Sequence, residues 1–180
     1  HASQSVPLVG VNLGQVGFLP EIAPSELEIG IRLLIQRKFQ IENRMMLEVI
    51  ALDPDGELKG SGTALNDIVV TRGGKSRILT LDLAIGNEMV DRIPGDGLII
   101  ATPTGSTAYS LSAGGPIIQP DLNLILITPL CPHTLHNRSY ITLSDTTVDV
   151  TIDAYPYPVL LSIDGREDLY LSQYDRIRAR

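Results

Sequence analysis

The sequence predicts a mainly β protein, a sandwich or barrel of many strands that follows a short α/β segment. Three observations predict this fold class. First, 16 Gly and 12 Pro are spread through the 180 residues and separate short apolar runs, which is typical of strands joined by turns. Second, several of the later runs alternate apolar and polar residues with the period of two of a strand. Third, only one segment has the 3.6-residue spacing of an amphipathic helix.

The first 40 residues predict a strand, a loop and a helix. The apolar run 7–11 has the length of a buried strand, and a glycine-containing loop follows it over residues 12–18. Pro24 and Ser25 then mark the start of a helix, and Ser25 with Glu28 three residues later forms a capping box. The helical stripe comprises Leu27, Ile31, Leu34, Ile35 and Lys38. We therefore expect residues 1–40 to form a short α/β segment, with a boundary near residues 39–44.

Residues 41–180 predict nine or ten short strands. The spacing favours a first strand over residues 45–51, followed by a turn at Asp53-Pro54-Asp55-Gly56. Two further dipeptides, Gly86-Asn87 and Asp164-Gly165, suit tight hairpin turns. The other predicted strands are 68–71, 79–85, 98–101, 124–128, 140–143, 148–152, 159–163 and 169–171.

Composition excludes several classes of protein. The 21 acidic residues outnumber the 14 basic ones and give a net charge of −7, which repels nucleic-acid backbones but leaves small nucleotides possible as ligands. Aromatic residues are 4% and Trp is absent, so a base-stacking platform is not expected. No apolar run reaches the roughly 20 residues that span a bilayer. The single Cys131 forms no internal disulfide and favours a reducing, cytoplasmic location.

The densest unusual segment covers residues 96–116, where a strand runs into a stretch of hydroxyls, glycines and alanines. Small residues let a ligand approach the backbone, and hydroxyls supply donors and acceptors without charge. Tyr109 adds a flat apolar face. The alternative, at about even weight, is a long surface turn whose hydroxyls cap its own backbone.

Three smaller features carry less information alone. Asn66-Asp67 combines an amide with a carboxylate and could bind a ribose diol, although a turn before a strand explains it as well. The Gly-x-x-Gly at residues 14–17 lacks the Gly-Lys-Ser/Thr of a phosphate-binding P-loop. Cys131, His133 and His136 lie within six residues, but a zinc site needs three or four ligands and no second cluster exists. We predict no metal site formed by this chain.

Four blocks of the sequence together resemble the NAD kinase family, in the order that the family has them. They are Gly10-Val11-Asn12-Leu13-Gly14 with Gly17-Phe18-Leu19, then Ala64-Leu65-Asn66-Asp67, then the run from Asp96 to Pro116, and then residues 129–135. The run Thr102-Pro103-Thr104-Gly105-Ser106-Thr107-Ala108-Tyr109-Ser110 is highly specific. The resemblance covers roughly residues 7–165.

The resemblance implies a reaction and an architecture. The family transfers the γ-phosphoryl group of ATP, or of inorganic polyphosphate in some members, to the 2′-hydroxyl of the adenosine ribose of NAD, which gives NADP. Mg²⁺ or another divalent cation accompanies the ATP. Members combine an N-terminal α/β nucleotide-binding domain, of which residues 1–40 would be a remnant, with a C-terminal β-sandwich that binds the substrate, here residues 41–180. They assemble as homodimers or homotetramers, and a neighbouring subunit contributes to the substrate site.

The resemblance also implies site residues by motif position. Asn66 and Asp67 would hold ribose hydroxyls of NAD, Phe18 would pack against the adenine, and Asp96 would face the nicotinamide side. The remaining NAD-binding residues would line an adenine or nicotinamide pocket: Thr104, Thr107, Ala108, Tyr109 and Ser112.

The sequence departs from the family in one respect. The family's Gly-Gly-Asp-Gly-Thr motif, which lies upstream of the Gly10–Gly14 block, is absent, so no catalytic residue can be assigned in this chain. Its Asp is the group thought to take the proton from the 2′-hydroxyl, and its glycines hold phosphates. We therefore expect this chain alone to bind NAD or NADP without transferring phosphate. The alternatives are a non-catalytic dinucleotide-binding or regulatory module and, less compatible with the Thr102–Tyr109 run, a lipid kinase.

Overall fold

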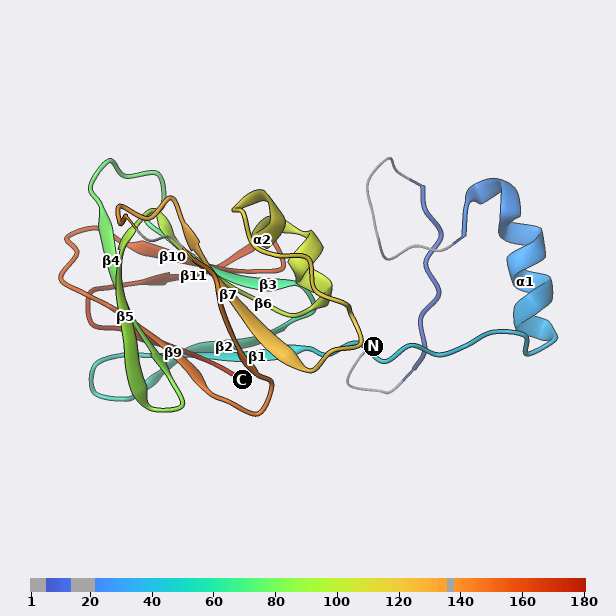
Figure 1. Cartoon of the computed structure of the whole chain (residues 1–180), viewed down its shortest axis with the longest axis horizontal. Coiled ribbons are helices and arrows are strands. Elements are labelled where there is room, and N and C mark those ends of the chain that lie inside the picture. The colour runs from blue at the N-terminus through green and yellow to red at the C-terminus, as the bar shows by residue number, and fades with distance from the viewer. Residues whose placement is uncertain (1–5, 14–21, 136–137) are drawn as a thin grey trace. The chain divides into compact units, whose positions relative to one another are not determined.

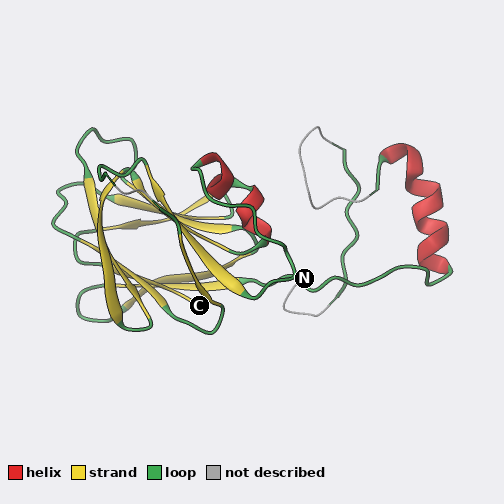
Figure 2. Cartoon of the chain, in the orientation of Figure 1, coloured by secondary structure: helices red, strands yellow, loops and turns green. Residues whose placement is uncertain are grey.

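The computed structural model describes residues 6–13, 22–135 and 138–180, in two units, residues 1–43 and 44–180. Figure 2 shows that the strands lie in the second unit, and Figure 1 labels most of them. Each unit is described by itself. No helix among the described residues is long and apolar enough to cross a membrane.

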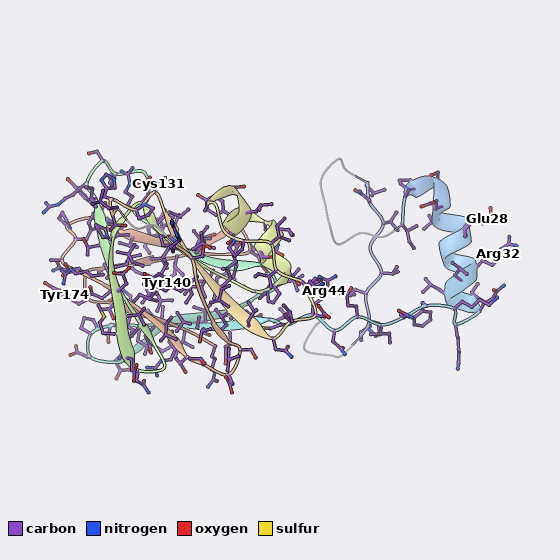
Figure 3. All side chains as sticks on the ribbon, in the orientation of Figure 1. Glu28, Arg32, Arg44, Cys131, Tyr140 and Tyr174 are labelled. Atoms are coloured by element: carbon purple, nitrogen blue, oxygen red, sulfur yellow. The ribbon has the colours of Figure 1, made fainter. Side chains whose placement is uncertain are left out.

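The first unit contains a 3-10 helix (Pro24–Glu26) that leads into the helix α1 (Leu27–Ile35). The predicted capping box at Ser25 and Glu28 is wrong, because the helical turns begin two residues earlier. Glu26 accepts a hydrogen bond from the Ala23 N–H (3.4 Å), and Glu28 instead pairs with Arg32 one turn along α1 (3.0 Å; Figure 3).

The predicted strand over residues 7–11 is also wrong. Within this unit, only a parallel bridge joins Val11 to Ile22, and residues 6–10 are exposed. An extended segment becomes a stable strand only when a neighbour pairs with its N–H and C=O groups over several residues. A single bridge leaves Leu8 and Val9 without such a neighbour among the described residues of the unit.

The second unit is a sandwich of two six-stranded antiparallel sheets, which confirms the predicted fold class. One sheet has the order β2-β1-β12-β9-β4-β5. Its strands are β1 (Leu47–Leu52), β2 (Leu58–Ala64), β4 (Leu79–Ile85), β5 (Glu88–Gly95), β9 (Val148–Ile152) and β12 (Arg176–Ala179). The other has the order β11-β10-β3-β6-β7-β8. Its strands are β3 (Asp67–Thr71), β6 (Gly97–Ala101), β7 (Leu124–Leu130), β8 (Tyr140–Leu143), β10 (Val159–Ile163) and β11 (Arg166–Leu171).

The core lies between the sheets, where alternate residues of both meet. Leu98 and Ile100 of β6 pack there with residues of the facing sheet such as Leu81 and Val150. A smaller cluster forms on the outer face of the second sheet, where Ile99 and Leu126 pack with the partly buried Ile118. The centre of this sheet is therefore covered on both faces, and all five residues of β6 are buried.

The predicted hairpin turns at Gly86-Asn87 and Asp164-Gly165 are confirmed. All four residues have positive φ, between 48° and 77°, as a two-residue type I′ turn requires. Asp164 has φ +48°, and its turn joins β10 to β11. This turn brings a carboxylate to the start of β3, because Ile163 pairs with Ile68.

Candidate functional site

The candidate site is built around the turn Leu65–Asp67, between β2 and β3. Asp67 begins β3 in register with Ala101 at the end of β6, so the turn lies beside the segment that follows β6. Thr102 joins the two, since its N–H donates to the Asn66 carbonyl (2.9 Å) and its hydroxyl to the Leu65 carbonyl (2.6 Å). No hydrogen bond among the described residues holds the side-chain amide of Asn66, which is half-buried.

Residues 102–118 form a compact cap that runs from the end of β6 toward β7. It contains the 3-10 helix η3 (Thr104–Thr107) and the single helical turn α2 (Tyr109–Ser112) (Figure 1). Several of its hydroxyls serve the fold. Ser106 donates to the Pro103 carbonyl (2.6 Å) and accepts from the Ile118 N–H (3.0 Å), and Ser110 bonds to Thr128 of β7 (2.8 Å). The interpretation that hydroxyls cap the backbone of their own segment is therefore correct for Ser106, whereas Ser110 bonds to a side chain of β7.

Other polar groups of the cap lie closer to its surface. Thr107 and Ala108 are half-buried, whereas Tyr109 (47% exposed) and Ser112 are exposed. Thr104 is buried, and its hydroxyl accepts a hydrogen bond from the guanidinium of Arg44 (3.3 Å), which Figure 3 labels.

Asp67 is a buried carboxylate at the meeting point of the turn and the cap. It is 5% exposed, and the backbone N–H of Tyr109 lies near enough to favour its charged form. Burial, followed by the nearby negative charge of Asp164, raises the pKa of Asp67 from 3.8 to about 6, although the Tyr109 N–H opposes the rise. The structure thus brings together Asn66, Asp67 and Tyr109, which the sequence separates by some 40 positions.

We expect the raised pKa of Asp67 to make stability depend on pH in a definite direction. Because the pKa is higher in the folded chain, folding binds protons between about pH 4 and pH 6, and the contribution of Asp67 falls as the pH rises through 6. The loss amounts to about 2–3 kcal/mol. Urea unfolding of the wild type and of Asp67→Asn at pH 4–7.5 measures it as a difference between the two proteins. Parallel pH profiles for the two would contradict the assignment.

Asp96 does not share this site within one chain. It precedes β6, whereas Asn66 and Asp67 lie at the far end of that strand, and five residues of strand separate the two ends by about 13 Å or more. Asp96 pairs there with Arg72 (2.8 Å) and is close to the end of β7, because its N–H donates to the Leu130 carbonyl (2.9 Å).

The segment with Cys131 and His133 follows β7, near Asp96, and the His133 N–H donates to the Pro94 carbonyl (2.7 Å). His136 and Phe18 lie outside the described residues. Within the described ranges, no three His, Cys, Asp or Glu side chains gather as a metal site would require. The described residues therefore do not fit a resident metal ion.

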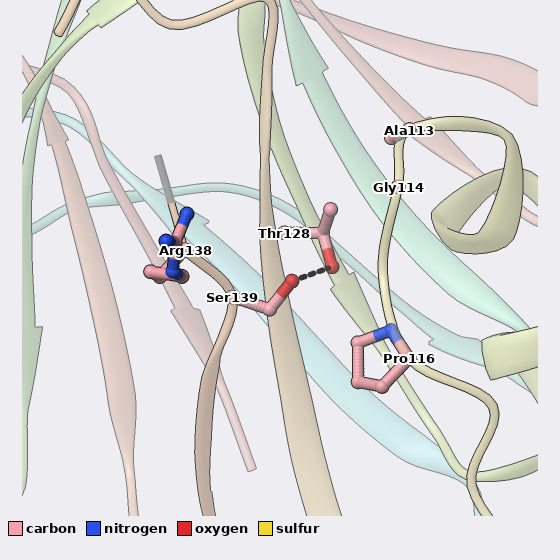
Figure 4. Close-up of a pocket in the computed structure, with 6 residues that line it drawn as sticks. All are labelled: Ala113, Gly114, Pro116, Thr128, Arg138 and Ser139. Atoms are coloured by element: carbon pink, nitrogen blue, oxygen red, sulfur yellow. Dashed lines mark hydrogen bonds between the residues drawn. The ribbon is translucent and has the colours of Figure 1, made fainter. Parts of the chain in front are cut away.

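Two open cavities lie away from the Asn66 turn. One, of about 370 Å³, lies beside the end of α2 and is lined by Ala113, Gly114, Pro116, Thr128, Arg138 and Ser139 (Figure 4). The hydroxyls of Thr128 and Ser139 bond to each other there (3.2 Å). The second, of about 460 Å³, lies along β7 and β8, with Leu122 and Ile141 in its lining. Neither contains a predicted NAD-binding residue.

Sequence reasoning missed three residues of the site: Thr102, Arg44 and Asp164. Thr102 lies inside the hydroxyl-rich run, which indicates a polar residue there but not its hydrogen bonds to Leu65 and Asn66. Arg44 falls at the domain boundary, where nothing local indicates its contact with Thr104. Asp164 was assigned only to a hairpin turn, and its contacts with residues 65–67 lie 97–99 positions away.

The chain is similar to proteins of known family. The sequence matches the family described as the ATP-NAD kinase C-terminal domain over residues 65–180. An NAD kinase from Acetivibrio thermocellus is 43% identical over 180 residues, covering 96% of this chain and 62% of that protein. The chain thus spans less than two thirds of the length of that relative.

Two solved structures are similar to the whole described fold. The crystal structure of yeast NADH kinase complexed with NADH matches with a TM-score of 0.91 at 34% identity, covering 96% of this chain and 50% of that chain. The structure of an NAD kinase from Archaeoglobus fulgidus in complex with ATP matches with a TM-score of 0.78 at 28% identity, covering 97% and 64%.

Proposed function

The chain belongs to the NAD kinase family, and from that premise we propose that it carries the NAD-binding part of such an enzyme. For the whole protein, we propose transfer of the terminal phosphoryl group of ATP or polyphosphate to the 2′-hydroxyl of the adenosine ribose of NAD. The product is NADP. Among the relatives, the yeast NADH kinase was solved with NADH and the Archaeoglobus NAD kinase with ATP.

The observation that carries the proposal is that Asn66 and Asp67, which are adjacent in the Leu65–Asp67 turn, lie beside Tyr109 at the start of α2. A ribose diol offers two hydroxyls, each a donor and an acceptor. The Asn66 amide supplies both kinds of group, and the Asp67 carboxylate accepts. The half-exposed ring of Tyr109 offers a flat apolar face for a base. Thr107, Ala108 and Ser112 supply hydroxyl and backbone groups beside this ring. Thr104 holds the guanidinium of Arg44 next to the same segment through its hydroxyl.

We propose that these 180 residues bind NAD and NADP without transferring phosphate. Phosphoryl transfer depends on positioning and charge neutralisation at the phosphates, and on a group that orients or deprotonates the attacking hydroxyl. The sequence lacks the family's Gly-Gly-Asp-Gly-Thr motif. The described residues also gather no metal site, so Mg²⁺ would enter with the phosphates of the nucleotide.

Asp96 supports a second part of the proposal, that the protein is a homodimer or homotetramer. Its position at the opposite end of β6 from Asn66 leaves it outside the site of its own chain. We propose that Asp96 instead approaches the nicotinamide side of NAD bound to a neighbouring copy.

We expect Asn66→Ala and Tyr109→Ala each to weaken NAD binding by about 5- to 100-fold, because each removes polar or stacking contacts that typically contribute about 1–3 kcal/mol. Isothermal titration calorimetry with NAD measures this, and circular dichroism checks the fold. Matched controls are Asn123→Ala, in the loop before β7, and Tyr170→Ala, at a position of β11 that is 65% exposed. Both controls should bind NAD like the wild type.

Activity assays on the same purified wild-type chain distinguish a kinase fragment from a regulatory module. Binding of NAD with no NADP formed from ATP or polyphosphate is the expected result. Turnover by this chain, free of host enzyme, would contradict the proposed incompleteness. Equal NAD affinity of the two site variants and the wild type would show that the assigned site is wrong. Recovery of turnover when a segment with the Gly-Gly-Asp-Gly-Thr motif is supplied would favour a kinase over a regulatory module.

A further inference from the structure

The side chain of Asp164 is hydrogen-bonded to the backbone of the turn that contains Asn66 and Asp67. Its carboxylate accepts backbone N–H groups from three consecutive residues: Leu65 (2.8 Å), Asn66 (2.7 Å) and Asp67 (3.2 Å). Successive N–H groups that converge on one point form an anion-binding concavity. Here the anion is a side chain of the same protein, from a hairpin nearly 100 residues away.

The hairpin geometry explains why Asp164 reaches this point. Asp164 and Gly165 form the two-residue turn between β10 and β11, with φ of +48° and +77°. Asp tolerates this left-handed conformation better than most residues, but Asn does so equally well. The hairpin turn alone therefore does not require a carboxylate at position 164. Three converging N–H groups favour one, because a carboxylate offers two acceptor oxygens and a negative charge.

The backbone of Leu65–Asp67 is held from two sides. Asp164 takes the three N–H groups, and its own N–H donates to the Asp67 carbonyl (3.0 Å). Thr102 donates to the remaining two carbonyls, those of Leu65 and Asn66. Every backbone polar group of the turn thus has a partner, so the directions of the Cα–Cβ bonds of Asn66 and Asp67 are fixed.

We propose that Asp164 is a positioning residue of the nucleotide site, which holds the Leu65–Asp67 backbone so that Asn66 and Asp67 face the ribose hydroxyls. The identity of the ligand rests on the proposed function, whereas the hydrogen bonds from Leu65–Asp67 to Asp164 do not depend on it. The carboxylate also acts on Asp67 by charge: the groups that set the pKa of Asp67, besides burial, are Asp164 from the hairpin and the Tyr109 N–H from α2.

Two variants separate positioning from charge. Asp164→Ala removes the acceptor and is expected to weaken NAD binding by about tenfold or more. Ribose hydroxyls donate to the ionised Asp67 carboxylate, so NAD binding by the wild type should strengthen as the pH rises through about 6. Asp164→Asn keeps one acceptor oxygen and the turn but removes the charge, so the pKa of Asp67 and this pH midpoint should both move below about 6. A matched control is Asp53→Ala, because Asp53 also accepts two backbone N–H groups in a turn, from Asp55 (3.0 Å) and Glu57 (2.8 Å), away from the site. It should change NAD affinity by less than about twofold.

A second readout needs no NAD. Amide hydrogen exchange of Asp164→Ala should show lost protection at Leu65, Asn66 and Asp67, with the core strands unchanged. Unaltered protection there, or NAD affinity and pH midpoint equal to the wild type in both variants, would overturn the proposal. If the wild type fails to bind NAD, the proposed function fails, and the exchange experiment still decides whether Asp164 holds the turn.

Discussion

Gly105→Ala is expected to abolish NAD binding, with affinity reduced more than about 100-fold, and to destabilise the sandwich by about 3 kcal/mol. A Cβ atom at Gly105 would lie 2.0 Å from the carbonyl oxygen of Asn66, 2.4 Å from its carbonyl carbon and 2.8 Å from its Cα. These atoms are backbone atoms held by Thr102 and Asp164, so they cannot swing aside as a flexible side chain does. Either the cap or the Asn66 turn must move.

Gly60→Ala is the matched control, since the nearest atom to its added Cβ is the terminal Cδ2 of Leu169 at 3.1 Å. Calorimetry with NAD and urea unfolding of both variants measure the two effects. The control should stay within about 1 kcal/mol of the wild type. A Gly105→Ala protein that binds NAD normally would show that the cap and the turn are not in the contact described.

Ile100→Ala is expected to lower the free energy of unfolding by about 2–5 kcal/mol. Ile100 is fully buried in the inter-sheet core and lies on β6 opposite Ile127 of β7. The covered sheet cannot collapse into the cavity from either face, which favours the upper part of this range. The matched control is Ile141→Ala on the edge strand β8, where the side chain is 54% exposed and should cost less than about 1 kcal/mol.

Urea unfolding at constant pH measures both variants, and NAD titration of the folded fraction separates stability from binding. Since Ile100 contacts the core and not the ligand site, affinity per folded molecule should stay within about twofold of the wild type. Equal losses of stability at positions 100 and 141 would contradict the description of β6 as covered on both faces.

Strands with alternating side chains, such as β4, and strands that are continuous apolar runs, such as β6, could be predicted from the sequence, whereas β2, β5 and β12 could not. The alternation of Leu79, Leu81 and Leu83 predicts β4 with its correct bounds, and β8, β9 and β10 also match their predicted ranges. β2 was missed because Gly60 and Gly62 have no side chain to alternate. β12 is short, and its charged residues mask the inward-facing Ile177 and Ala179.

The site could be predicted in part, because its residue types are unusual but its bonds are not local. Asn66, Asp67 and Tyr109 were expected together from the family resemblance, and the structure places them side by side. Ser106 accepts a hydrogen bond from the Ile118 N–H and Ser110 bonds to the hydroxyl of Thr128, and no local sequence pattern indicates either partner. Asp164 acts across 97–99 residues, so its turn was predictable and its partners were not.

The central place of β12 has a consequence for how the chain is made. This strand follows the other described strands in the sequence, yet it lies between β1 and β9 and pairs with both. During synthesis on the ribosome, β1 and β2 emerge long before the strand that joins them to β9, β4 and β5. Until residues 176–179 emerge, both β1 and β9 expose an unpaired edge, a form of surface that invites wrong pairing. The pairing of this sheet is therefore completed only when β12 has been made, and until then the edges of β1 and β9 are open to incorrect pairing.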